Sequence, residues 1–328
     1  MKSKFFFIEE KNLEQFIFVL LSKYDVVAPI KKGDVSVFDS IKSFGDIDLN
    51  FINTTFPPKK YFLPNDEKIL EYKLNDISSS YEEKKRIIFG IRPCDVHSIL
   101  HQEKIFLDSN FLDLYYYKRR ENTLIFALNC SESGENCFCN SLGTDKLTSG
   151  FDLLFSKVSD GYVVEIGSEK GNEILINAKK FFKEANGKEN EIKSIICKKS
   201  LSEKEIEKLE NSFNSKIWEK YSEKCLSCCA CTITCPNCLC FGLRDLINLD
   251  LKSGERIREW QSCQLKVFTK VAGEYVFRNE RYKRFRHRIY HQLNYFKKQY
   301  GVHFCVGCGR CISNCPTKID MTEIIKEL

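Results

Sequence analysis

Two similar cysteine runs near the C-terminal end of this 328-residue chain constrain its fold more than any other feature. They read CLSCCACTITCP at 225–236 and CVGCGRCISNCP at 305–316, and both follow the pattern C-x2-C-x2-C-x3-C-P. Three cysteines at this spacing turn the backbone around one [4Fe–4S] cluster and leave a fourth coordination site open. The proline keeps the peptide after the last cysteine out of a helix. The spacing therefore predicts two cluster-binding loops.

The fourth cysteine of such a run usually binds the other cluster. We therefore expect two ligand sets, Cys225, Cys228, Cys231 with Cys315 and Cys305, Cys308, Cys311 with Cys235. A zinc ribbon explains the runs poorly, because its knuckles lack the third and fourth cysteines. Disulfides are poorer still, because cysteines three residues apart on a tight loop do not form a sensible framework.

The cysteine content and the charge bear on location and partners. Seventeen cysteines, with no secretion signal in the opening MKSKFFFIEEKNLEQF, favour a reducing cytoplasm. No stretch approaches 18 apolar residues, so no membrane span is expected.

The formal net charge of +6 counts cysteines as neutral. Two clusters with a charge of roughly −2 each would lower the net charge of the holoprotein to about +2. Most of the excess positive charge therefore disappears once the clusters are bound.

Residues 1–200 alternate helix and strand signals and predict an α+β domain. LEQFIFVLLSK at 13–23 has helical periodicity, and RIIFGI at 86–91 and TLIFAL at 123–128 indicate buried strands. The Asp160-Gly161 pair predicts a hairpin turn.

A charged connector at 201–217 follows, opened by a capping box from Ser202 to Glu205. Residues 218–328 then form a mainly α-helical, ferredoxin-like domain for two [4Fe–4S] clusters. Its long insert at 241–303, with GLRDLINL, GERIREWQSCQLKVFTKVAG and RFRHRIYHQLNYFKKQYG, is expected to be helical.

Four cysteines of the first domain form a candidate third site. Cys94 follows the first predicted buried strand, Cys130 follows the second, and Cys137 and Cys139 lie on the next polar loop. If the two strands are parallel neighbours, their carboxyl ends meet at the edge where α/β folds build sites. The four thiols would then hold a third Fe–S cluster or another metal. The alternative is that Cys94 and Cys130 are small buried apolar side chains and the C-x-C is incidental.

Other groups allow more than one interpretation. Cys238, Cys240 and Cys263 pack against a cluster, bind a ligand together or fill space, and Cys197 is expected to be structural. The basic and aromatic run 278–292 would suit nucleic acid, but a helix packed beside anionic clusters explains it better. His287 and His291 have a metal-binding spacing without an acidic partner.

Taken together, these stretches resemble one family, which comprises the iron–sulfur beta subunit of sulfhydrogenases and the corresponding iron–sulfur subunit of anaerobic sulfite reductase. The matching stretches span most of the chain and are PPKKYFLP (57–64), GIRPCDVHSI (90–99), NCSESGENCFCNSLGT (129–144), GFDLLFSKVSDGYVVEIGSEKG (150–171), CPNCLCF (235–241), GERIREWQSC (254–263) and CVGCGRCISNCP (305–316). PPKKYFLP favours the sulfhydrogenase branch. Cys229 departs from the family, which usually has glycine there, and so does VAGEYVF at 271–277.

The resemblance implies an electron-transfer subunit with two [4Fe–4S] clusters. It would relay electrons between two other subunits. One would bind a flavin and NAD(P), and the other would be the catalytic subunit, either a NiFe hydrogenase or a sirohaem sulfite reductase. The sequence has no GxGxxG opening a helix, no CxxCH, no HExxH and no visible Ser/His/Asp arrangement. We therefore name no catalytic residue and expect substrate chemistry in another subunit. The alternatives are a reductase of small sulfur oxidants acting through the N-terminal cysteines, and a nucleic-acid-binding Fe–S protein.

Overall fold

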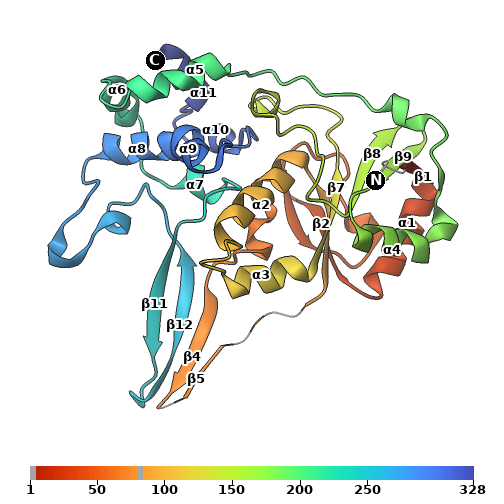
Figure 1. Ribbon diagram of the computed structural model, residues 1–328, viewed down its shortest axis with the longest axis horizontal. Helices are drawn as coiled ribbons and strands as arrows, with labels where there is room; N and C mark the ends of the chain where they lie inside the picture. Colours follow the sequence, from red (N-terminus) through yellow and green to blue (C-terminus); the bar gives the residue numbers. More distant parts are fainter. Residues whose placement is uncertain (1–4, 75, 80, 82–83) are drawn as a thin grey trace.

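The structure is a computed structural model that describes residues 5–74, 76–79, 81 and 84–328. Residues 1–4, part of the opening segment assessed for a secretion signal, lie outside this range. A sheet-based region holds the N-terminus, a helical region holds the C-terminus, and a narrow arm of strands projects from between them (Figure 1). The predicted boundaries at 200 and 217 stay predictions.

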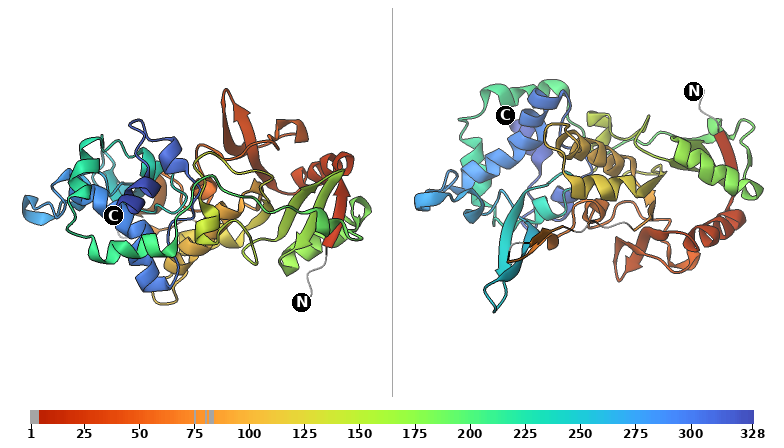
Figure 2. Two further views of the ribbon diagram at one scale, coloured as in Figure 1. Left: turned by 90° about the horizontal axis from the view of Figure 1, so that it is seen from above. Right: turned by 60° about the horizontal axis from the view of Figure 1, so that its bottom comes forward.

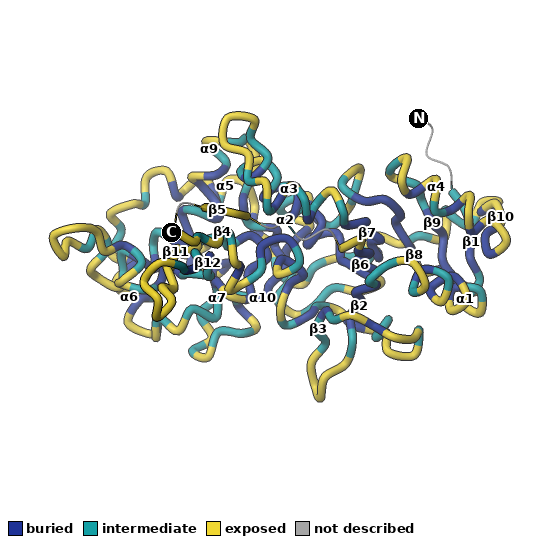
Figure 3. Tube along the Cα trace, turned by 90° about the horizontal axis from the view of Figure 1, so that it is seen from below, coloured by how far each residue is buried: buried dark blue, intermediate teal, exposed yellow. Residues whose placement is uncertain are grey.

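An eight-stranded mixed sheet forms the N-terminal region, in the order β10-β1-β9-β8-β7-β6-β2-β3. Its strands are β1 (Phe5–Glu9), β2 (Asp25–Lys32), β3 (Val35–Ser40), β6 (Arg86–Ile91), β7 (Thr123–Leu128), β8 (Leu153–Val158), β9 (Gly161–Ile166) and β10 (Lys183–Glu184). Strands β6 and β7 are buried along their whole length (Figure 3) and pair in parallel. The two buried strands and the hairpin of β8 and β9 are therefore confirmed.

Helices cover both faces of this sheet, because each carries one apolar stripe. On one face lie α1 (Glu10–Leu21) and α4 (Glu169–Asn177), and on the other lie α2 (Pro93–Phe106) and α3 (Leu114–Glu121). Phe16 of α1 stacks on Phe126 of β7 with 6.3 Å between ring centroids. Helix α2 begins almost directly after β6, which places Cys94 and Asp95 at the carboxyl edge of the sheet.

The arm is a second, four-stranded antiparallel sheet in the order β11-β12-β4-β5 (Figures 1 and 2). Its strands are β4 (Glu67–Lys73), β5 (Asp76–Ser78), β11 (Phe241–Ile247) and β12 (Ser253–Trp260). The helical prediction for the insert 241–303 is wrong over these last two strands. Strand β12 gains partners on both sides, and its Arg258 is paired in the protein interior with Glu67 of β4. Local periodicity does not reveal a partner about 190 residues away.

The remaining helices pack around Trp218, Leu293 and Ile324 at the C-terminal end. They are α5 (Glu203–Glu207), α6 (Ile217–Glu223), α7 (Ala230–Ile233), α8 (Arg281–Tyr290), α9 (Phe296–Tyr300), α10 (Arg310–Ser313) and α11 (Met321–Glu327). The capping box that opens α5 is confirmed. A π-helical turn, His291–Tyr295, joins α8 to α9, so residues 281–300 are helical as predicted, whereas residues 261–280 hold only two short 3-10 turns. None of the described helices is long and apolar enough to cross a bilayer.

Candidate iron–sulfur site

The two cysteine runs fold into matching loops. Ser227 and Gly307, each two residues after the first cysteine of its run, have positive φ values of 53° and 63°. Their N–H groups donate to the sulfurs of Cys225 and Cys305, both at 3.4 Å. N–H donors aimed at thiolates are among the contacts that set the potential of an iron–sulfur cluster. Both loops therefore present their first cysteine in the same way.

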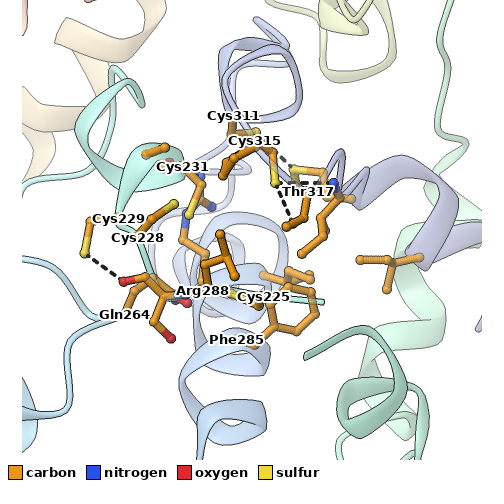
Figure 4. Close-up of a pocket in the computed structure, with 18 residues that line it drawn as sticks. Cys225, Cys228, Cys229, Cys231, Gln264, Phe285, Arg288, Cys311, Cys315 and Thr317 are labelled. Atoms are coloured by element: carbon orange, nitrogen blue, oxygen red, sulfur yellow. Dashed lines mark hydrogen bonds between the residues drawn. The ribbon is translucent and has the colours of Figure 1, made fainter. Parts of the chain in front are cut away.

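Each loop then turns into a short helix through a left-handed residue, Cys229 (φ 68°) before α7 and Gly309 (φ 72°) before α10. This match explains why the family usually has glycine where Cys229 stands. The Cys229 thiol turns aside and donates to the Ser227 carbonyl at 3.5 Å (Figure 4). It does not point at the space that the other cysteines of its run share (Figure 4).

The first predicted ligand set lines one pocket. Its cysteines come from both runs and are Cys225, Cys228, Cys231 and Cys315 (Figure 4). The N–H of Ile319 donates to the Cys315 sulfur at 3.3 Å. Much of the remaining lining is apolar, including Phe285 and Met321. Cys229 and Cys311 also line it, so the pocket offers six thiols on a largely apolar wall, which suits a cluster more than a hydrated ion.

The second predicted ligand set also gathers, and it is more deeply buried. Burial raises the pKa of Cys305, Cys308 and Cys311, and in each case the charge of Cys235 raises it further. A hydrogen bond from Cys238 lowers the pKa of Cys235. Cysteines of the first and second runs are therefore neighbours here too. In the described part of the chain, no three His, Cys, Asp or Glu side chains are placed to hold a single metal ion.

Arg288, on α8, lies close to cysteines of both sets. Its guanidinium lines the first pocket and donates to the Cys231 carbonyl at 3.0 Å. Burial would lower its pKa, but the charges of nearby cysteines, Cys238 and Cys235 first among them, raise it well above the usual value. Its Nε is buried with no hydrogen-bond partner among the described residues. An anionic cluster would satisfy that donor, so the residues present fit the group.

Two more polar residues reach the second set, and the sequence did not single out either one. The π-helical turn presents Gln292 to the sulfurs of Cys235 (3.9 Å) and Cys238 (3.8 Å). Lys59, from the N-terminal region, is 4% exposed and donates to the carbonyl of Cys238 at 3.0 Å. Burial lowers the pKa of Lys59, and the charges of Cys238 and Cys235 oppose that shift. A π-turn is a common marker of functional sites.

The N-terminal cysteines are only partly arranged as predicted. Burial raises the pKa of Cys137 to about 12, and the charges of Cys308, Cys197 and Cys130 contribute. The Cys139 sulfur lies 3.5 Å from that of Cys197, a residue expected to be structural.

Cys94 instead packs against Val306 and Cys308. Cys139 and Cys197 are thus in direct contact, and burial and the charges of Cys197, Cys137 and Cys130 all raise the pKa of Cys139.

The other groups left open by the sequence have clear places. Cys263 hydrogen-bonds to Cys240, which lowers the pKa of Cys240. The rings of His287 and His291 stack at 5.8 Å, and burial lowers the pKa of each to about 4. In the basic run 278–292, Arg288 faces the cysteines, as expected for a helix beside anionic clusters.

Comparison with known proteins fits this geometry. Residues 224–319 match the model of the 4Fe-4S dicluster domain. The chain is 36% identical to sulfhydrogenase 2 subunit beta of Pyrococcus furiosus over 311 residues, which cover 92% of each chain. The chain belongs to the sulfhydrogenase beta subunit family. No solved structure matches it.

Membership confirms the resemblance on which the sequence prediction rested. This member of the family is an iron–sulfur electron-transfer subunit, and its dicluster domain binds two [4Fe–4S] clusters. The choice of ligands, the partner subunits and a third site go beyond this finding.

Proposed function

We propose that this sulfhydrogenase beta subunit relative holds its two clusters through the two mixed cysteine sets and relays electrons between two other subunits. One would bind a flavin and NAD(P), and the other would be a catalytic NiFe hydrogenase subunit. The observation that carries the proposal is that cysteines of both runs line one pocket and lie around the buried Arg288. Two clusters bound by neighbouring cysteines would be close enough to exchange electrons.

The chain's own residues have a defined share in this task. Each bound cluster supplies a site that accepts and releases one electron. Arg288 offsets the added negative charge, and the N–H groups of Ser227 and Gly307 do the same at single sulfurs. The apolar wall around Phe285 keeps water from the first set and so preserves the strength of these interactions.

Two surface features support work inside a complex. Cys228 is exposed, so the first set lies near the surface. The arm exposes large apolar side chains near its tip, namely Leu74, Ile77, Ile247, Leu249 and Leu251. Grouped apolar residues of this kind are typical of surfaces that another protein covers.

Anaerobic reconstitution with two matched variants tests the ligand sets. The full chain should bind at least about eight irons, four for each cluster. Cys315→Ala should lose about four of them, whereas Cys229→Ala, on the same pocket but turned aside, should lose none. Equal losses in both variants, or fewer than about eight irons in the parent chain, would refute the assignment.

Co-purification from native cells tests the partners. Recovery of the chain with a flavoprotein and a nickel-containing subunit is the expected result, and recovery with a sirohaem protein would refute the hydrogenase assignment. The reductase alternative makes a separate prediction. If the purified holo chain alone reduces sulfite or polysulfide with a chemical electron donor, the chain is an enzyme in its own right.

A further inference from the structure

We propose that Cys130, Cys137, Cys139 and Cys197 hold a third iron–sulfur cluster beside the second one. The inference rests on the proposed relay, which it extends by one carrier. It also replaces Cys94, the fourth ligand predicted from the sequence, with Cys197.

The segment 195–201 is fixed against the cysteine loop, which is what brings Cys197 into the group. The N–H of Cys197 donates to the Asn140 side-chain oxygen at 2.8 Å, and the Asn140 amide donates to the Ile195 carbonyl at 3.3 Å. The Ser133 hydroxyl donates to the Ile196 carbonyl at 2.8 Å. Farther along, the N–H of Leu201 donates to the Ser141 hydroxyl at 2.9 Å.

A connector that only spanned two domains would need none of these bonds. Together they hold the Cys197 sulfur 3.5 Å from that of Cys139. Cys94 is less suitable as the fourth ligand. Its buried side chain packs against Val306 and Cys308, on the loop of the second cluster.

The group is built directly onto the loop of the second cluster. The Cys137 thiol donates to the Cys308 carbonyl at 3.7 Å, and the N–H of Phe138 donates to the Gly307 carbonyl at 2.8 Å. A Cβ on Gly307 would lie 2.6 Å from the Cys139 nitrogen, so only glycine permits this approach. Thr144 adds a bond to the Val306 carbonyl at 2.7 Å. Direct contact between the two cysteine loops would bring their clusters close enough for electron transfer.

This placement favours a redox cluster over a structural metal. The loop is already held by the bonds to 195–201 and to the second cluster loop, so it does not need a metal to fold. A cluster there would take one electron from the second cluster and release one electron outward, with no bond made or broken.

The outward route is short. Cys130 and the neighbouring Asn129 line an open pocket beside Ile192 and Lys193. The relay would then run from the surface at Cys228, through the two ferredoxin-type clusters, to a second surface at Cys130. Two exits of this kind suit a protein that contacts an electron donor on one side and an acceptor on the other.

Iron and acid-labile sulfide counts on the anaerobically reconstituted full chain test the proposal, together with EPR of the reduced protein. The parent chain should hold about twelve irons and show three interacting paramagnets. Cys197→Ala should hold about eight irons and lose one of the three EPR signals. Cys94→Ala, the matched control, should keep about twelve irons. Cys137→Ala serves as a second ligand variant if Cys197→Ala fails to fold.

Each result has one meaning. About eight irons in the parent chain would overturn the third cluster and leave the proposed two-cluster relay intact. Substantially fewer than eight would remove the relay as well. Zinc in place of the third set of irons, or loss of iron from Cys94→Ala but not from Cys197→Ala, would overturn the proposal as stated.

Discussion

Arg310 and Asp95 form a buried, two-pronged ion pair that joins the second cluster loop to the N-terminal sheet. Their two N···O distances are 2.6 and 2.7 Å, and the side chains are 2% and 0% exposed. Arg310 stands between Cys308 and Cys311. It also donates to the Thr54 carbonyl at 2.7 Å and to the Thr54 hydroxyl at 3.1 Å, which accounts for two of the three N–H groups that Asp95 does not use. The charge of Asp95 helps to raise the pKa of Arg310 far above its usual value against the effect of burial.

Removing one partner of this pair should destabilise the holoprotein strongly. Asp95→Ala leaves a buried guanidinium without its counter-charge, which costs about 3–5 kcal/mol. Denaturant unfolding measured anaerobically, with iron content followed in parallel, gives the free energy of unfolding. Asp39→Ala, which breaks the exposed Lys32–Asp39 pair at 2.7 Å, is the control and should cost about 1 kcal/mol or less. Equal costs for the two variants would contradict the structural role of Arg310.

The sequence predicted what local spacing and periodicity determine. The cluster loops, the buried strands β6 and β7, and the Ser202 capping box all depend on residues a few positions apart. Strand β12 did not follow from such patterns. Its conformation depends on pairing with β4 and on the long-range ion pair between Arg258 and Glu67, and both partners lie far away in the chain.

In the candidate site too, the sequence predicted the residues that belong to a local motif and did not predict those placed by tertiary structure. The spacing pointed to the eight ferredoxin-type cysteines, and the structure brings cysteines of both runs together. Arg288, Gln292 and Lys59 carry no motif, because their importance comes from the tertiary placement of α8, the π-turn and the N-terminal region. Cys197 was expected to be only structural, because nothing in the sequence around it signals the hydrogen bonds that hold it beside Cys139.

Exchanging the left-handed residues of the two loops should give opposite results. Cys229→Gly removes a side chain from a residue with φ of 68°, a conformation that costs a non-glycine residue about 1–2 kcal/mol. We expect a gain of about 1 kcal/mol in the free energy of unfolding and no loss of iron. Gly309→Cys should destabilise the chain, since its Cβ would lie 2.4 Å from the Asn136 carbonyl oxygen. Loss of four irons from Cys229→Gly would instead identify Cys229 as a ligand.

Neighbouring lysines offer a test of the contact between the N-terminal region and the cluster domain. Lys59 is buried over the Trp260 ring, with its nitrogen 4.4 Å from the centroid, whereas Lys60 is exposed. Lys59→Met should lose the hydrogen bonds to the Thr232 and Cys238 carbonyls and destabilise the holoprotein by about 1–3 kcal/mol. Lys60→Met should change the free energy of unfolding by less than about 0.5 kcal/mol. Anaerobic unfolding of both variants makes the comparison, and equal effects would show that the buried contact contributes nothing.

Arg288 should set the reduction potentials of both ferredoxin-type clusters. A buried positive charge favours the state that holds one more electron, so Arg288→Met should lower both potentials. The shift should be on the order of 100 mV, because a unit charge a few ångström away is worth a few kcal/mol at an effective dielectric of about 20.

Potentiometric titration followed by EPR measures this shift cluster by cluster. Arg286→Met is the control from the same helix, because its guanidinium sits over the Phe213 ring at 3.5 Å and lies away from the cysteines. That variant should leave both potentials within about 20 mV of the parent, as expected for a charge that water screens. Equal shifts in the two variants would mean that the general charge of α8 acts on the clusters. A shift confined to Arg288→Met, with full iron content, would assign the effect to the buried guanidinium.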